Sequence, residues 1–453
     1  MRFKATLLLA LVFAGLGLYL FLIEFPKEQK KEAEEEKASR VFSFSFKEVS
    51  GLIVRYLNMD EISLTKGGDG KWRMTRPMET PASRTLINKI IGLTGSLEFK
   101  RVTEEKPVEL RSFGLDPPQI LISLKFPDHE EQLLIGDDAP ASPAYYIKKG
   151  HEARVLLVDH EMDDLKHSLE EERSVKAWRK KEIAEVAFNK LKTIRMVYGD
   201  RAFTLTREDN EWWLREPLHA LADRLTVNGL IQTIFSLTAE DFIDDRKTQE
   251  QKKFGPPKIT MTLSGESQNQ NVKFYRQAQE KKGDDRFYAV SDPDEPIYIL
   301  KGNGFDNMMQ KDLYALRDKA VLNIQRSAIQ EVRIQTGPDS FSLFKKDDGW
   351  RMDDQRTEAD KEKVAKLLDD LDLMKAQKFL DDNPNDLSIY GLAEPQRQIT
   401  FYNKDKELLG KLLLGKDQGD MIYAKSDSQP SVILVKKSIL DAIRSKAQFV
   451  KKS

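Results

Sequence analysis

Cysteine is absent from this chain of 453 residues. The absence excludes a disulfide framework, a thiol nucleophile and a thiolate metal site. It is compatible with an oxidising compartment, where a stray thiol is a liability, although many cytosolic proteins lack cysteine as well.

An excess of one charge sign is also absent. The chain has 73 Lys and Arg against 74 Asp and Glu, a formal net charge of −1. Such a mixture predicts neither a nucleic-acid-binding surface nor an acidic tail, so we expect no nucleic-acid partner. The length predicts about three domains of roughly 150 residues each.

One long uncharged run, residues 5–23, follows a short basic end at residues 1–4. At about 1.5 Å per residue, a helix over this run would match a bilayer core of about 30 Å. We expect a retained transmembrane anchor, because the run is longer than a signal h-region and lacks a small-residue cleavage site. A cleaved secretory signal is the alternative. Arg2 and Lys4 favour a cytoplasmic N-terminus, which leaves the bulk of the chain outside.

Residues 24–40 mix glutamate and lysine with almost nothing apolar. A segment of this composition cannot bury enough surface to fold alone, so it predicts a charged stalk. Membrane binding by its lysines is a weaker alternative, because interleaved glutamates offset them.

A motif that begins at a tryptophan occurs three times after the stalk. Trp72, Trp212 and Trp350 each follow a turn and stand at nearly constant distance before an aromatic-glycine pair: Phe113-Gly114, Phe254-Gly255 and Tyr390-Gly391. The copies are spaced by about the size of one domain, so each is expected to have its own core. The predicted modules are residues 41–180, 181–320 and 321–449.

Each copy has the same order of predicted elements. Alternating residues at 42–46 and 52–56 predict strands, and a hairpin leads into the tryptophan. A helix follows, with Ser83 and Asp360 as N-caps in the first and third copies. Its buried stripe has the i, i+4, i+7 spacing at Leu86, Ile90 and Leu93, at Val227, Ile231 and Ile234, and at Val364, Leu368 and Leu371. Further strands complete an α+β fold, a mainly antiparallel sheet with a packed helix.

The second copy departs most from this pattern. It has no Leu-Asp after its glycine and no counterpart of Gly136, and it shows a polar insertion around Gln268 to Asp285. We expect this copy to be the one that has drifted or been specialised.

The order of motifs resembles the domain-of-unknown-function 4340 family. The resemblance covers the chain after the stalk and is strongest at Phe113–Pro118 and Tyr390–Pro395. It implies a bacterial, membrane-anchored protein, often encoded beside ABC-type transport systems of the gliding-motility kind. The implied location is the inner membrane, with the bulk on the periplasmic side. The family supplies no catalytic residues.

Residues for chemistry are sparse, and we predict no catalytic, cofactor or metal site. The five histidines are His129, His151, His160, His167 and His219. Of these, His160 and His167 lie seven residues apart on a predicted helix, which separates the rings by about 10 Å, too far for one metal ion. A solvated helix face is the favoured interpretation.

Acidic pairs follow each predicted helix, at Glu104-Glu105, Asp244-Asp245 and Asp381-Asp382. These pairs could bind calcium or take part in acid–base chemistry. A structural role in turns or at helix ends is the favoured interpretation. The glycines of residues 66–71 do not have the spacing of a phosphate-binding loop. No G-x-S-x-G nucleophile motif is present.

The repeat tryptophans have two possible roles. Exposed indoles would stack on sugars, whereas buried ones would fill the module cores beside Met74, Leu214 and Met352. We favour the core. The basic end of the chain, including Lys436, Lys437, Arg444, Lys451 and Lys452, predicts a solvated terminal helix, with contact to anionic lipid as the alternative.

The predicted function is a single-pass, membrane-anchored extracytoplasmic scaffold or accessory protein without enzymatic activity, auxiliary to an ABC-type transport or surface-assembly complex. The expected partners are the membrane and proteins of that complex. A cell-envelope glycan-binding module and an envelope hydrolase are the alternatives. No cofactor is expected, and any small-molecule ligand is unknown.

Overall fold

A computed structural model describes most of the chain. The described residues are 21–22, 38–140, 143–159, 164–245, 247–277, 285–291, 295–301, 305–306, 308, 312–346, 349–353, 356–443 and 445–451. The predicted anchor at 5–23 and stalk at 24–40 therefore lie outside the described residues, apart from 21–22 and 38–40. Within the described ranges, no helix is long and apolar enough to cross a membrane.

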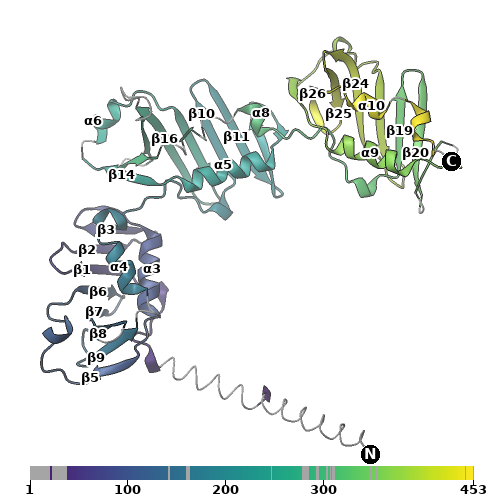
Figure 1. The fold of residues 1–453 in the computed structure, drawn as a ribbon. Helices are drawn as coiled ribbons and strands as arrows, with labels where there is room; N and C mark the ends of the chain where they lie inside the picture. Colours follow the sequence, from purple (N-terminus) through teal and green to yellow (C-terminus); the bar gives the residue numbers. More distant parts are fainter. Residues whose placement is uncertain are drawn as a thin grey trace, which may run out of the picture. The chain divides into compact units, whose positions relative to one another are not determined.

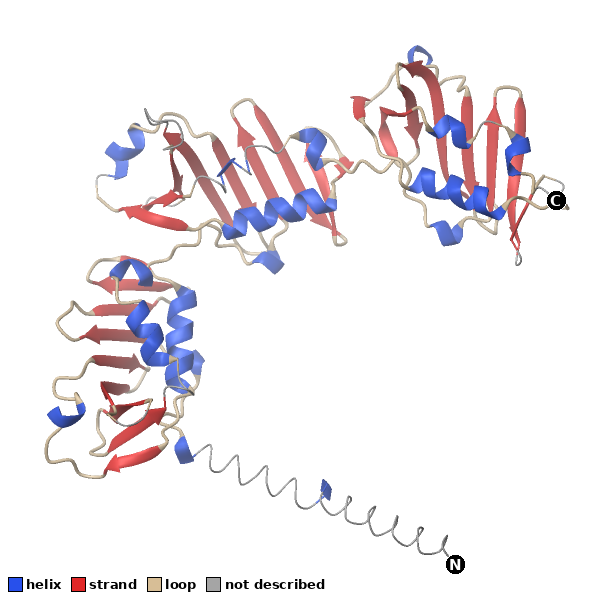
Figure 2. Ribbon diagram, in the orientation of Figure 1, coloured by secondary structure: helices blue, strands red, loops and turns tan. Residues whose placement is uncertain are grey.

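The chain folds as antiparallel sheets with a few helices packed on them (Figures 1 and 2). The α+β prediction therefore gave helices too large a share: the fold is mostly β. The chain divides into two compact units, Met1–Lys181 and Glu182–Ser453. The first unit contains one sheet and the second contains two, so the tandem repeat seen in the sequence corresponds to three sheets.

The first module contains η2 (Phe46–Glu48), β1 (Gly51–Tyr56), β2 (Ile62–Lys66), β3 (Trp72–Arg76), β4 (Thr80–Pro81), α3 (Arg84–Gly95), β5 (Arg101–Glu104), η3 (Arg111–Phe113), β6 (Ile120–Lys125), β7 (Glu130–Asp138), β8 (Ala144–Lys149), β9 (Val155–Asp159), α4 (Leu165–Glu171) and η4 (Val175–Trp178).

The second module contains η5 (Phe188–Lys190), β10 (Thr193–Tyr198), β11 (Arg201–Glu208), β12 (Glu211–Glu216), β13 (Ala220–Leu221), α5 (Arg224–Ser236), β14 (Ala239–Ile243), α6 (Lys247–Lys252), β15 (Ile259–Ser264), β16 (Asn269–Gln277), β17 (Arg286–Val290), β18 (Ile297–Leu300) and α8 (Leu313–Leu316).

The third module contains η6 (Arg326–Ala328), β19 (Glu331–Thr336), β20 (Asp339–Lys346), β21 (Gly349–Arg351), α9 (Lys361–Asp372), β22 (Lys378–Asp381), η7 (Ser388–Tyr390), β23 (Arg397–Tyr402), β24 (Leu408–Gln418), β25 (Met421–Ser426), β26 (Gln429–Lys436), α10 (Ile439–Ala442) and η8 (Lys446–Phe449).

The three sheets share one topology. The first has the order β4-β3-β2-β1-β6-β7-β8-β9-β5, and the second repeats it as β13-β12-β11-β10-β15-β16-β17-β18-β14. The third, β21-β20-β19-β23-β24-β25-β26-β22, has eight strands among the described residues. A single bridge, Arg351 with Glu358, stands where the other modules have β4 or β13.

The first hairpin forms as predicted, with Leu64 paired with Met74 and Lys66 with Trp72. The strand predicted at 42–46 is wrong: the segment is irregular and ends in η2. Two of its phenylalanines pack rather than pair, since Phe42 is buried and Phe44 lies edge-on to Phe126 with ring centroids 5.4 Å apart.

One long helix crosses a face of each sheet, as Figure 2 shows for α3, α5 and α9. The Ser83 hydroxyl accepts a hydrogen bond from the backbone N–H of Leu86, and the Asp360 carboxylate accepts from Glu362 and Lys363, so both predicted N-caps are confirmed. The apolar stripes are buried against the sheets, with Leu93 only partly covered. Burial of each such side chain contributes about 1.5–3 kcal/mol.

Candidate functional site

The histidines considered as metal ligands have separate local partners. His129 pairs with Asp128, His151 with Glu131 and His167 with Glu171, while His219 lies beside Trp213 and Arg215. His160 lies outside the described residues. Among the residues that the structure describes, no group of three or more His, Cys, Asp or Glu side chains is placed to hold a metal ion.

The acidic pairs differ in their surroundings. Glu104 and Glu105 are exposed, as is Asp245, while Asp244 is half-buried. The Asp381 carboxylate has the expected turn role, because it accepts a hydrogen bond from the backbone N–H of Asn383 at 3.1 Å. Asp382 has a role that the sequence did not predict, because it forms an ion pair with Arg317.

Two of the repeat tryptophans are core residues. Trp72 and Trp212 are only 6% and 7% exposed, and Met74 and Leu214 beside them are fully buried. Trp350 is half-buried and packs against the core of the third module. The indoles of Trp72 and Trp212 are therefore not accessible for stacking on a sugar.

The aromatic-glycine motif packs against a later strand of its own sheet. Phe113 lies edge-on to Tyr146 with ring centroids 5.0 Å apart, and Tyr390 lies 5.3 Å from Tyr423. The glycine that follows each aromatic has a left-handed backbone conformation, with φ of 65° at Gly114 and 67° at Gly391. A side chain at either glycine would be strained.

The second module replaces this arrangement with an aromatic cluster. Tyr275 of β16 occupies the position of Gly136, because Ile259 pairs with Phe274 as Ile120 pairs with Ile135. Phe254 stacks on Tyr288 with ring centroids 4.1 Å apart. With Tyr275 and Ile297, these rings form a buried cluster separate from the main core.

The insertion predicted in this module is shorter than expected. Residues 269–277 form β16, the equivalent of β7, and the remainder, 278–284, lies outside the described residues. The polar composition of β16 misled the prediction, because only alternate residues of this strand face the core.

Each module closes by pairing its last residues with the segment just before its long helix. The bridges are Ala82 with Arg179, Ala222 with Arg317 and Ala359 with Val450. The backbone N–H of the helix N-cap then donates to the residue before the bridge, as Asp223 donates to the carbonyl of Leu316 at 2.8 Å. The exit of the chain thus helps to fix the start of the helix.

The connection between the second and third modules is very short, because two adjacent residues are hydrogen-bonded to different modules. The backbone N–H of Asp318 donates to the carbonyl of Leu221 in the second module at 2.9 Å. The very next residue, Lys319, accepts from the N–H of Ala376 in the third module at 2.8 Å. The Gln429 side chain also binds this connection: its Nε2 donates to the carbonyls of Asp318 and Ala320.

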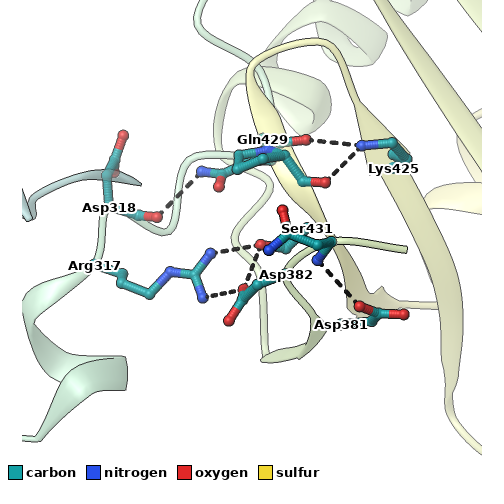
Figure 3. Close-up of polar contacts among 9 residues, drawn as sticks. Arg317, Asp318, Asp381, Asp382, Lys425, Gln429 and Ser431 are labelled. Atoms are coloured by element: carbon teal, nitrogen blue, oxygen red, sulfur yellow. Dashed lines mark hydrogen bonds and ion pairs between the residues drawn. The ribbon is translucent and has the colours of Figure 1, made fainter. Parts of the chain in front are cut away.

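Arg317 is the side chain at the centre of this crossing, and it is 2% exposed (Figure 3). Its Nη1 donates to Asp382 Oδ1 at 2.7 Å, and its Nη2 donates to the Ser431 hydroxyl at 2.6 Å. The same hydroxyl donates to Asp382 Oδ1 at 2.6 Å, which closes a triangle. The guanidinium carbon lies 3.6 Å from the centre of the Phe379 ring.

Arginine suits this position because its planar guanidinium forms directed hydrogen bonds and stacks on an aromatic face. A buried charge requires both a counter-charge and hydrogen bonds to offset its lost hydration. Asp382 provides the counter-charge, and Ser431 adds a hydrogen bond. Nearby, burial lowers the pKa of Lys425, whose Nζ donates to the carbonyl of Pro430 at 2.7 Å.

We regard this junction, formed by Arg317, Phe379, Asp382, Gln429 and Ser431, as the candidate functional site. Its hydrogen bonds join the last residues of the second module to side chains of the third. Sequence reasoning missed it, although a signal was present: Arg179 follows Trp178 at the end of the first module just as Arg317 follows Leu316.

Fold and junction define the class of protein, a tandem array of mostly β modules that repeat one topology. Residues 72–258, 212–358 and 350–453 each match the family model described as "Domain of unknown function (DUF4340)". Together these matches span residues 72–453, and each begins at one of the repeat tryptophans, Trp72, Trp212 or Trp350. The chain belongs to this family. No curated protein matches it.

Proposed function

We propose that this protein is a membrane-anchored, extracytoplasmic scaffold arm that serves as an accessory to an ABC-type transport or surface-assembly complex. The anchor is the apolar run at residues 5–23, and the modules that follow are the arm. The link to transport rests on the family resemblance.

The Arg317 junction is the observation that favours a scaffold. A fixed module-to-module contact has a use in a protein that holds partners at a set separation. The junction makes that contact through an ion pair whose arginine is buried, a hydroxyl and an aromatic ring. Buried polar groups of this kind favour one defined arrangement over many loose ones.

The test is gentle extraction of membranes that contain the tagged full-length chain, followed by identification of the co-purifying proteins. We expect integral subunits of a transport system in amounts comparable to the chain. Recovery of no transport subunit, or a chain that does not sediment with the membranes, would overturn the proposal.

Two variants sharpen this experiment. Arg317→Met removes the junction charge and should reduce the recovery of partners that contact both of the last two modules. Arg326→Met is the matched control, because Arg326 forms an ion pair with Asp369 in which both side chains are about half exposed. Exposed pairs contribute little, so recovery should not change. Equal recovery with both variants would show that the junction is not needed for assembly.

A further inference from the structure

The helix face of the third module has a groove of about 740 Å³ between α9 and the segment that contains α10 and η8. Its floor is apolar and buried, formed by Leu367, Met374, Ile439 and Phe449. Leu373 stands at the rim with 73% of its surface exposed. Leu373 extends the apolar surface of this depression, and concave, mostly apolar surfaces are where ligands preferentially bind.

The first module shows what covers the equivalent surface there. In that module α4 packs against α3, and Figure 2 shows the two helices side by side on one face of the sheet. Leu165 and Leu169 of α4, one helical turn apart, are fully buried. The third module has only the short helix α10, Ile439–Ala442, at this place. Helix α10 packs against α9 as α4 packs against α3, but it is shorter, and the groove lies between α9 and α10.

The charges around the groove are mainly positive. Lys363, Lys366, Lys375 and Lys436 line it, against Asp370 and Asp441. Asp370 forms an ion pair with Lys366, in which the Nζ atom and a carboxylate oxygen are 3.0 Å apart. Lys375 and Lys436 are exposed, and neither forms an ion pair within the described part of the chain. Acidic side chains beside an apolar stripe would complement this rim.

We propose that this groove binds an amphipathic helix of a partner protein, with leucine-like residues on the inner face and glutamate or aspartate on its flanks. The mode is helix-in-groove recognition, in which residues at i, i+4 and i+7 enter the apolar floor. The identity of the partner rests on the proposed scaffold function, but the groove and its preference do not. The two can therefore fail separately.

The probe is a synthetic helical peptide of about 15 residues with leucines at i, i+4, i+7 and i+11 and glutamates at the flanking positions. A second peptide has lysine at every glutamate position. Binding of each fluorescently labelled peptide to the full-length chain is measured by anisotropy. We expect the acidic peptide to bind at least tenfold more tightly than the basic one.

Three variants test the location. Lys375→Glu with Lys436→Glu should weaken the acidic peptide at least tenfold and strengthen the basic one. Ala442→Trp, which places an indole in the groove, should abolish binding of both. Lys345→Glu with Lys346→Glu is the matched control, because it makes the same charge change at exposed lysines of β20. Circular dichroism and thermal unfolding confirm that each variant is folded.

Several outcomes would overturn the proposal. One is equal affinity for both peptides, and another is binding that survives Ala442→Trp. Binding of anionic phosphatidylglycerol vesicles through Lys375 and Lys436, with no peptide binding, would assign the groove to lipid. A dimer seen by sedimentation and lost in Ala442→Trp would assign it to a second copy. If transport subunits still co-purify with Ala442→Trp, the groove is not their binding site, and the scaffold proposal stands.

Discussion

Gly136 lies directly beneath the backbone carbonyl of Phe113, and a Cβ at position 136 would stand 2.1 Å from that oxygen. The third module repeats this relationship, because a Cβ at Gly415 would stand 2.2 Å from the carbonyl oxygen of Tyr390. The obstacle in both cases is backbone, which cannot turn aside as a flexible side chain can. The aromatic-glycine turn and the later glycine are therefore one structural unit.

Gly136→Ala and Gly415→Ala should each lower the free energy of unfolding by about 1–3 kcal/mol, the usual cost of overpacking. Gly92→Ala in α3 is the control, since a Cβ there meets nothing within 4 Å. Alanine is the better helix former, so this variant should gain up to about 1 kcal/mol. Urea unfolding of the full-length chain measures all three. An unchanged midpoint for Gly136→Ala would refute the packing argument.

The two sides of the junction should respond unequally to mutation. Asp382→Ala leaves a buried guanidinium without its counter-charge, which costs roughly 3–5 kcal/mol. Arg317→Met should cost less, because the remaining carboxylate is 38% exposed and can be hydrated. Unfolding free energies and the rate of proteolysis within residues 317–320 measure the difference. Equal costs for the two variants would contradict the assigned burial.

Trp72→Ala should destabilise the first module by roughly 3–5 kcal/mol, since it removes a buried indole from the core. Trp213→Ala is the comparison, because Trp213 is half-buried and lies against His219. Its loss should cost clearly less. The measurement is thermal unfolding of both variants. A stable Trp72→Ala protein that had lost binding to a glycan would instead favour a glycan-binding role.

Glu61 should make the first module less stable in acid. Hydrogen bonds from Ser63 and Arg55 lower the pKa of its carboxyl from the ordinary value of 4.5. The contribution of this group is therefore complete above that value and is lost as the pH falls through the lowered pKa of the folded state. Glu61→Gln should be less stable than the wild type at pH 7, and the two should converge in acid. Parallel stability curves down to pH 2 would count against this. Ser63→Ala should give an intermediate difference.

The sequence predicted local features that depend on short-range chemistry. The N-caps Ser83 and Asp360 were found because a capping side chain bonds to backbone within three residues. The helix stripes were found because their periodicity is set by the buried face. The hairpin into Trp72 follows from its turn.

Features that depend on distant residues were not predictable. The polar strand Asn269–Gln277 was predicted as an insertion, because one of its buried positions is a polar residue, Gln270, which hides the alternation. Phe42 and Phe44 have the alternation of a strand, yet Phe42 packs beside Phe44, and Phe44 packs onto Phe126, far along the chain. The junction was missed because Arg317 and Asp382 are 65 residues apart in the sequence and meet only in the folded chain.

The crossing between the second and third modules also limits how such a protein can change in length. Asp318 is bonded to the module behind it and Lys319 to the module ahead, so an inserted residue would have to break one of these bonds. Short insertions and deletions at this boundary should be selected against, whereas duplication of a whole module reproduces both halves of the contact. Arrays of this kind are expected to evolve by gaining or losing complete copies.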